Sequence, residues 1–186
     1  MRLRPTELLA LFAIGAVGGL IGDQGHVVSG TTRYLNHGVP FIWKSAIWFP
    51  LLVGVATVGT AELRLRLAEP RPGDVWEGIG AAASVIAIYA VTAVVRDAAL
   101  GPATALVWSL AALVLWRFGD GRPALICAIA VAIIGTVVEI VMVGAGIFEY
   151  AGPIDSLGGV PPWLPGLYFA FGVVAARLGE LFATSR

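Results

Sequence analysis

The chain has 186 residues, of which 58% are hydrophobic and only 13% charged, and its mean hydropathy is +0.87. A soluble domain of this size carries about 25% charged residues, so the composition excludes a soluble globular protein and predicts an integral membrane protein with a single domain over residues 1–186. The formal net charge is zero, which gives no electrostatic reason to expect a nucleic-acid partner.

Six apolar runs are long enough to cross a bilayer, which takes about 20 helical residues. The sequence therefore predicts an all-α bundle of six transmembrane helices, near residues 7–27, 42–62, 76–96, 98–117, 123–148 and 162–183. No A-x-A cleavage site follows the first run, so it is expected to be a retained helix rather than a signal peptide. Its GxxxG patterns suit packing inside the bundle or self-association, which leaves a homo-oligomer open; the glycines are Gly15, Gly18, Gly19 and Gly22.

Lysines and arginines are unevenly distributed over the connections between these runs, and their excess marks the cytoplasmic side. Nine lie on the side of the two termini and three on the other side. Both termini are therefore predicted in the cytoplasm, and the Ala, Val, Gly and Arg bias indicates the inner (plasma) membrane of a high-GC bacterium. Several of the nine lie in the basic connection at 64–74, which is expected to lie at the cytoplasmic surface and to fix the orientation of the protein in the membrane.

The longest polar stretch, residues 22–38, follows the first run. It carries Asp23, Gln24, His26, Ser29 and His37. No GxSxG surrounds Ser29, no HExxH is present, and the histidine spacing matches no known metal site, so neither a catalytic nor a metal site is predicted. One interpretation of the stretch is a solvated loop that continues the first helix. The other places Asp23 and Gln24 at the mouth of a cavity, facing the head of a lipid, because they come about four turns into the first helix, near its outer end.

Two residues interrupt the apolar second and third runs. Pro50 falls within the second run, where it frees a carbonyl one turn back and predicts a kink that opens a cleft. Tyr89 falls in the middle of the third run. A buried phenol needs a partner, which is either a neighbouring backbone carbonyl or the head of a ligand.

A glutamate lies inside the apolar fifth run, in the stretch GTVVEIVMVG (135–144). One face of this helix carries small residues together with Glu139, and the opposite face carries bulky branched ones. Because small residues mark helix contacts in lipid, Glu139 is predicted to point into the bundle, one turn after Gly135. A carboxyl at this depth is costly unless it is protonated or hydrogen-bonded. Three roles stay open: an interhelical hydrogen bond that fixes helix register, a cavity wall, or a proton or ion relay.

Four stretches resemble the Insig (insulin-induced gene) family of six-helix membrane proteins. They are KSAIWFPLLVG (44–54), LAEPRPGDVW (67–76), GTVVEIVMVGAGIFEYAGP (135–153) and WLPGLYFAFGVVAARLGEL (163–181). The resemblance covers most of residues 40–183. It implies a protein that is not an enzyme, binds a sterol within the membrane and holds partner membrane proteins. The chain departs from the family at Glu139 and Ile140, where the family has a small polar residue followed by Gln.

The resemblance also bears on Asp97, at the end of the third run. It matches an aspartate that in animal relatives belongs to the surface for partner proteins, which implies a partner-binding role here. The alternatives are a solvated loop carboxylate and a cap for the fourth helix.

The leading hypothesis is a membrane-embedded lipid-binding or lipid-sensing protein. Its ligand is expected to be a neutral lipid, such as a sterol, a hopanoid or a diacylglycerol, because no deep cluster of basic residues would hold a phosphate. No other cofactor is expected. The first alternative is a small transporter or channel that uses Glu139 for protons or cations, and the second is an enzyme that acts on lipids. The predicted ligand-binding residues are Glu139, Gln24, Asp23, Gly135 and Tyr89.

Overall fold

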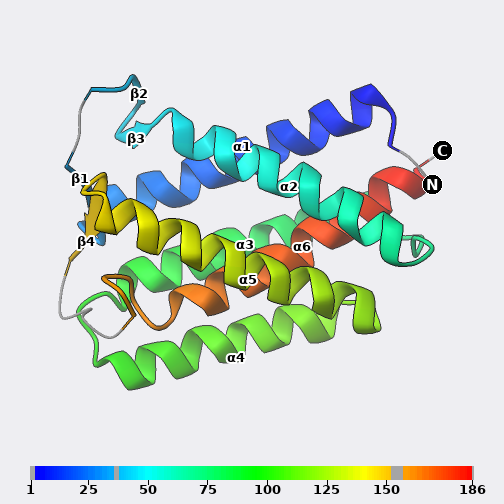
Figure 1. Ribbon diagram of the computed structural model, residues 1–186. Coiled ribbons are helices and arrows are strands. Elements are labelled where there is room, and N and C mark those ends of the chain that lie inside the picture. The colour runs from blue at the N-terminus through cyan, green and yellow to red at the C-terminus, as the bar shows by residue number, and fades with distance from the viewer. Residues whose placement is uncertain (1–2, 36–37, 152–156, 186) are drawn as a thin grey trace.

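The computed structural model describes residues 3–35, 38–151 and 157–185. Within these ranges the chain forms six helices and two short two-stranded sheets (Figure 1). The elements in chain order are α1 (Pro5–Ser29), β1 (Thr32–Tyr34), β2 (Phe41–Ile42), β3 (Ser45–Ala46), α2 (Trp48–Leu67), α3 (Val75–Val94), α4 (Leu100–Phe118), α5 (Gly121–Gly144), β4 (Phe148–Tyr150) and α6 (Leu164–Thr184). The described helices other than α2 are long and apolar enough to cross a membrane by length and composition.

The connections alternate between two ends of the bundle (Figure 1). The terminal end is the one where α1 begins and α6 ends, and it also holds the connections from α2 to α3 and from α4 to α5. The strand end holds the four short strands. There β1 pairs with β4, which ties the segment after α1 to the segment after α5, and β2 pairs with β3 in a hairpin that leads into α2.

Local sequence signals define several helix ends. α1 has Pro5 at its first turn and a capping box in which the Arg4 backbone N–H donates to Glu7 Oε2 at 2.6 Å. It ends at Gly30, whose φ of 77° is the left-handed conformation that glycine adopts without strain. α3 begins at Asp74, whose carboxylate accepts from the Glu77 N–H at 2.8 Å.

The predicted boundaries of the second run, 42–62, were wrong. Residues 41–46 form the β2–β3 hairpin, and α2 continues to Leu67. The first half of the hairpin, residues 41–43, is apolar and was therefore assigned to the helix. At the other end, the arginines of the RLRL segment are typical of a loop, but Arg64 is fully buried in ion pairs and the helix continues through it. Pro50 is the third residue of α2. Its missing N–H has no helical acceptor there, so the predicted kink was also wrong.

α6 is the centre of the bundle (Figure 1). In its most apolar stretch 72% of the residues are buried, against 22–28% in the corresponding stretches of α1, α3, α4 and α5. A Cβ added to Gly172 would lie 2.8 Å from Ala128 Cα of α5, and one added to Gly179 would lie 2.8 Å from Ala61 Cα of α2. The backbones of the three helices therefore nearly touch, as small residues allow in membrane bundles.

The glycine face of α1 also packs inside the bundle. A Cβ at Gly15 would overlap Thr57 Oγ1, and a Cβ at Gly19 would lie 2.8 Å from Val53 Cβ, both on α2. Gly18, in contrast, has no such neighbour in the described structure. Three of the four glycines in the predicted GxxxG patterns thus serve internal contacts, because Gly22 packs in the same way against the ring of Tyr89 on α3.

Candidate ligand cavity

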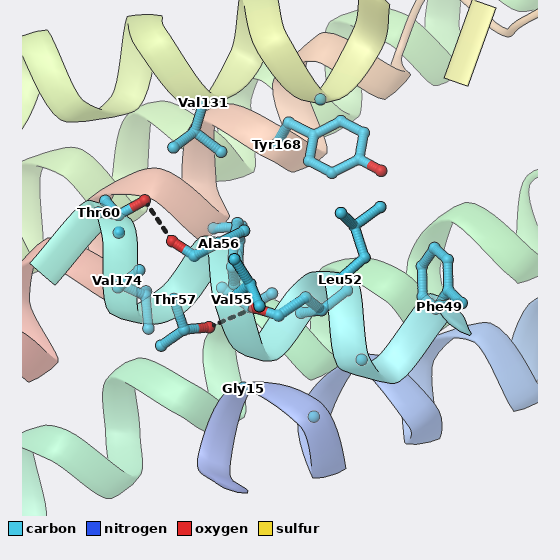
Figure 2. A pocket seen from close by; sticks show the side chains of 18 of the residues that line it. Gly15, Phe49, Leu52, Val55, Ala56, Thr57, Thr60, Val131, Tyr168 and Val174 are labelled. Carbon is cyan, nitrogen blue, oxygen red and sulfur yellow. Dashed lines mark hydrogen bonds between the residues drawn. The ribbon is translucent and has the colours of Figure 1, made fainter. Parts of the chain in front are cut away.

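A cavity of about 760 Å³ lies among α1, α2, α3, α5 and α6. This volume is in the usual range for ligand pockets, roughly 300–1,000 Å³. Figure 2 shows the apolar character of its wall, where Val131 of α5 and Tyr168 of α6 face Leu52 and Ala56 of α2. The space exists because small residues occupy many of the lining positions, including Gly135 on α5. An apolar ligand body fits such a wall.

Few polar groups line this cavity. Thr57 and Thr60 donate their hydroxyls to carbonyls of their own helix, Val53 O at 2.8 Å and Ala56 O at 2.7 Å (Figure 2). No lysine or arginine is among the described residues that line the cavity. The other side chains of the described lining with strong hydrogen-bonding groups are Trp48, Tyr89, Glu139 and Tyr168.

Glu139 is the one carboxyl in the described lining, and it is 5% exposed. Tyr168 of α6 donates to its Oε1 and Tyr150 of β4 donates to its Oε2. Burial, and then the adjacent Glu139, raise the pKa of the Tyr150 hydroxyl well above its usual value, so this phenol stays protonated and donates. Each carboxyl oxygen retains capacity for a further hydrogen bond. Glu139 therefore makes an interhelical hydrogen bond and lines the cavity at once.

Tyr89 lies beside this carboxyl in the cavity wall. Its ring packs against Gly22, where an added Cβ would lie 2.7 Å from the ring, and against His26, whose ring centroid is 5.0 Å away. His26 is itself held by a hydrogen bond of 2.8 Å between its Nε2 and Thr92 Oγ1. The close fit at Gly22 fixes the position of the phenol relative to the cavity.

A second, much smaller space of about 20 Å³ lies at the strand end, and we name it the polar chamber. The Tyr34 hydroxyl donates to Asp23 Oδ2 at 2.7 Å in its wall. Burial, and then the Asp23 carboxyl, raise the pKa of the Tyr34 hydroxyl, so this phenol also stays protonated. The chamber shares part of its wall with the cavity and is lined by Asp23, His26, Thr32, Tyr34, Trp48, Phe49, Tyr89, Glu139, Phe148, Tyr150, Leu164 and Leu167.

The other predicted site residues lie in different places. Gly135 lines the cavity, where a Cβ would lie 2.7 Å from the Tyr168 ring. Asp23 lines the chamber and not the cavity. Gln24 lines neither space, because the Gln24 Oε1 accepts from the Lys44 N–H at 2.9 Å and holds the β2–β3 hairpin. The structure thus brings Glu139, Tyr89 and Gly135 together and leaves Gln24 apart.

Asp97 is on the surface, with 81% of its side chain exposed, and it accepts from Arg96 Nε at 3.0 Å. The residue that caps α4 is Ala99, so the suggested capping role of Asp97 was wrong. In the described ranges no group of three or more histidine, cysteine, aspartate or glutamate side chains could hold a metal ion. His37 lies outside the described residues.

A buried ion-pair cluster at the terminal end was not predicted. Arg64 of α2 is fully buried and pairs with Glu180 of α6, and Arg177 of α6 pairs with Glu180 at 2.9 Å and with Glu77 of α3 at 2.7 Å. The two guanidiniums also donate to four carbonyls of the α2–α3 connection. The sequence did contain an indication of this cluster, since Arg177 and Glu180 are three residues apart inside an apolar run, on one face of the helix. The cluster closes this end of the bundle.

These features define a helical membrane protein whose helices form a partly open apolar cavity with a hydrogen-bonded carboxyl in its wall. The chain belongs to the Insig family. It is 50% identical, over its full length and 91% of the relative's length, to an INSIG protein homolog from Mycolicibacterium vanbaalenii. It is 27% identical to the human insulin-induced gene 1 protein, with 94% of this chain and 65% of the human protein covered. The names of these relatives indicate no catalytic function.

Solved structures agree with this assignment. The crystal structure of a mycobacterial Insig homolog from Mycobacterium vanbaalenii matches the chain with a TM-score of 0.96 at 50% identity, covering 100% of this chain and 98% of that one. A cross-linked trimer of the same homolog matches equally well, with a TM-score of 0.96 at 49% identity. No protein-family model matches the chain. The family resemblance inferred from four sequence stretches is confirmed, and the mycobacterial relatives are in line with a bacterial source.

Proposed function

We propose that the protein holds one neutral lipid in the cavity, with the apolar body among α1, α2, α3, α5 and α6 and a small polar head at Glu139. The observation that carries this proposal is the cavity itself: about 760 Å³ of apolar space with one carboxyl in its described lining, oriented by two phenols from other elements. A carboxyl that only fixed helix register would not need to line an open space.

The chemistry of the lining favours an uncharged head with a hydroxyl group. A phosphate head would be buried opposite a carboxyl with no guanidinium or ammonium among the described lining residues, and an unpaired buried charge is very costly. A hydroxyl can donate to Glu139 and accept from the phenol of Tyr89. A sterol-like lipid and a diacylglycerol both meet this requirement.

The role that we propose for lipid binding is sensing rather than transport. A transport path needs polar groups across the whole bilayer, whereas the polar lining groups that remain available gather around Glu139. We further propose that both termini lie in the cytoplasm of a bacterial inner membrane and that Asp97 contributes to a surface for another membrane protein or a second copy. The cross-linked trimer of the mycobacterial homolog supports a homo-oligomer of this chain.

Lipid identification tests the proposal directly. The protein is purified in detergent, and co-purified lipids are extracted and quantified by mass spectrometry for the wild type, Glu139→Leu and Glu149→Gln. Glu149 is a matched control because its side chain is 43% exposed and pairs with Arg33 away from the cavity. We expect about one neutral lipid per chain in the wild type and the control, and a loss of at least tenfold in Glu139→Leu.

A second variant keeps the test informative if Glu139→Leu does not fold. Ala56→Phe places a large ring in the cavity and leaves the carboxyl and its two phenols unchanged. It is expected to lose the lipid while its thermal unfolding stays close to that of the wild type. Retention of the same lipid in both variants would overturn the proposal, and proton or cation flux in proteoliposomes that Glu139→Leu abolishes would support transport instead.

A further inference from the structure

The polar chamber contains an unsatisfied hydrogen-bonding group. Thr32 is 6% exposed and lines the chamber, and its Oγ1 has no hydrogen-bond partner among the described residues. Leaving such a group unpaired costs about 1–3 kcal/mol. The chamber volume of about 20 Å³ exceeds the minimum of roughly 10–15 Å³ that one water molecule needs. The chamber is therefore built to hold one water-sized polar group.

The chamber adjoins the cavity at Glu139, the proposed position of the lipid head. Five of its lining residues also line the cavity, and these are Trp48, Phe49, Tyr89, Glu139 and Phe148. Glu139 and Tyr89 thus mark the boundary between an apolar space large enough for a lipid body and a polar space large enough for a single oxygen. Asp23, whose Oδ2 accepts from Tyr34, lines the chamber but not the cavity.

We propose, on the basis of the proposed function, that the polar chamber is a hydroxyl-selective head site of the lipid cavity. The free hydroxyl of the bound lipid enters the chamber, donates to one of the two carboxyls in its wall and accepts from the Thr32 hydroxyl. A water molecule takes the same place when the lipid is absent. The site thereby distinguishes a lipid with a free hydroxyl from its esterified or phosphorylated form.

The lining explains this selectivity through charge and size. No lysine or arginine lines the chamber among the described residues, so the charge of a phosphate would be buried there without a cation to pair with it. An acyl ester has no hydrogen to donate to these carboxyls, and its additional atoms exceed a space of about 20 Å³. A hydroxyl is small and both donates and accepts.

The test compares three probes in nanodiscs of phosphatidylcholine. Delipidated protein is titrated with a 1,2-diacylglycerol, with the same lipid acetylated at its hydroxyl, and with the matching phosphatidic acid, and bound lipid is measured by native mass spectrometry. Two hydrogen bonds in a buried site at about 1 kcal/mol each predict a preference of roughly tenfold or more for the free hydroxyl.

Thr32→Val removes the unpaired hydroxyl and is expected to reduce this preference about fivefold, which corresponds to one hydrogen bond of about 1 kcal/mol. The matched control is Thr104→Val, because Thr104 Oγ1 is also buried without a partner in the described structure but lines neither space. Thr32→Ser keeps a hydroxyl and should keep the preference. Neither valine variant removes a hydrogen bond between described protein groups, so both are expected to fold.

The outcomes separate this inference from the proposed function. Equal binding of the diacylglycerol and its acetate, with lipid still released by Glu139→Leu, would refute the head site and leave the cavity proposal intact. Equal losses of preference in Thr32→Val and Thr104→Val would also refute it, because the chamber would then have no special role. Binding of none of the three probes would refute the head site as proposed, and the absence of any co-purified neutral lipid in the wild type would overturn both proposals.

Discussion

The ion-pair cluster at the terminal end permits a quantitative prediction for Arg177→Met. The arginine is 1% exposed and donates to both carboxylates of the cluster, Glu180 at 2.9 Å and Glu77 at 2.7 Å, and to the carbonyls of Arg71 at 2.8 Å and Pro72 at 3.0 Å. Methionine keeps much of the volume and removes the charge and every donor. The substitution leaves two carboxylates and two carbonyls short of partners in a nearly closed environment.

The expected loss is about 3–5 kcal/mol, the usual cost of removing one partner of a buried ion pair. For a chain of this size, about 2–4 °C of melting temperature corresponds to each kcal/mol, so Arg177→Met should unfold roughly 6–20 °C below the wild type. Tryptophan fluorescence during heating in a mild detergent measures this shift. The comparison is made at one detergent concentration, because bound detergent changes the apparent stability.

Arg66→Met is the control, since this arginine is 79% exposed and lies 3.9 Å from Glu62 on the same helix. Exposed pairs of this type contribute about 0.3–0.5 kcal/mol, which corresponds to a shift of roughly 2 °C or less. A melting temperature of Arg177→Met within this range of the control would refute the structural role assigned to the cluster. A double substitution provides a further check. Glu180→Gln is expected to lower the free energy of unfolding less in the Arg177→Met background than in the wild type, because Arg177 and Glu180 share one interaction.

Two further substitutions test the lipid site and the corrected helix boundary. Tyr168→Phe removes one of the two donors to Glu139. It should lower the free energy of unfolding by about 1–3 kcal/mol and reduce the amount of co-purified lipid. Unchanged values in both measurements would contradict the orienting role of this phenol. Pro50→Ala should change the stability by no more than about 1 kcal/mol and leave the lipid content unchanged, because Pro50 lies in the first turn of α2. A loss of bound lipid in Pro50→Ala would restore the kink hypothesis.

Hydropathy and helical periodicity were sufficient for the bundle and for the direction of Glu139. Each of these two features can be read from a single helix, because the bilayer determines how apolar the helix must be and which of its faces packs. On α5 the small residues Ala128 and Ala132 are buried with Glu139, whereas Ile133 and Val137 are exposed. Lipid is as apolar as the bulky side chains, so shape rather than polarity determines which face packs.

The partners of Glu139 could not be predicted in the same way. Tyr150 is 11 residues away in a short strand and Tyr168 is 29 residues away in another helix, and nothing in the local sequence distinguishes them from aromatic residues that fill a core. Gln24 illustrates the opposite error. Its position one residue after Asp23 gave it the same predicted role, but on a helix consecutive residues point in directions about 100° apart, and Gln24 turns to the β2–β3 hairpin.

Two of the buried polar sites in the described structure are attached to α6, which explains why this deeply buried helix also carries charged residues. Tyr168 near its start holds Glu139 at the strand end, and Arg177 and Glu180 near its end form the cluster at the terminal end. Tyr168 and Arg177 are separated by roughly 13 Å along the helix axis, nine residues at about 1.5 Å each. Between them, Phe171, Val174 and Ala175 line the cavity. A shift of α6 that accommodates a lipid would therefore move residues bonded to the α2–α3 connection, and the buried ion pairs oppose such a shift.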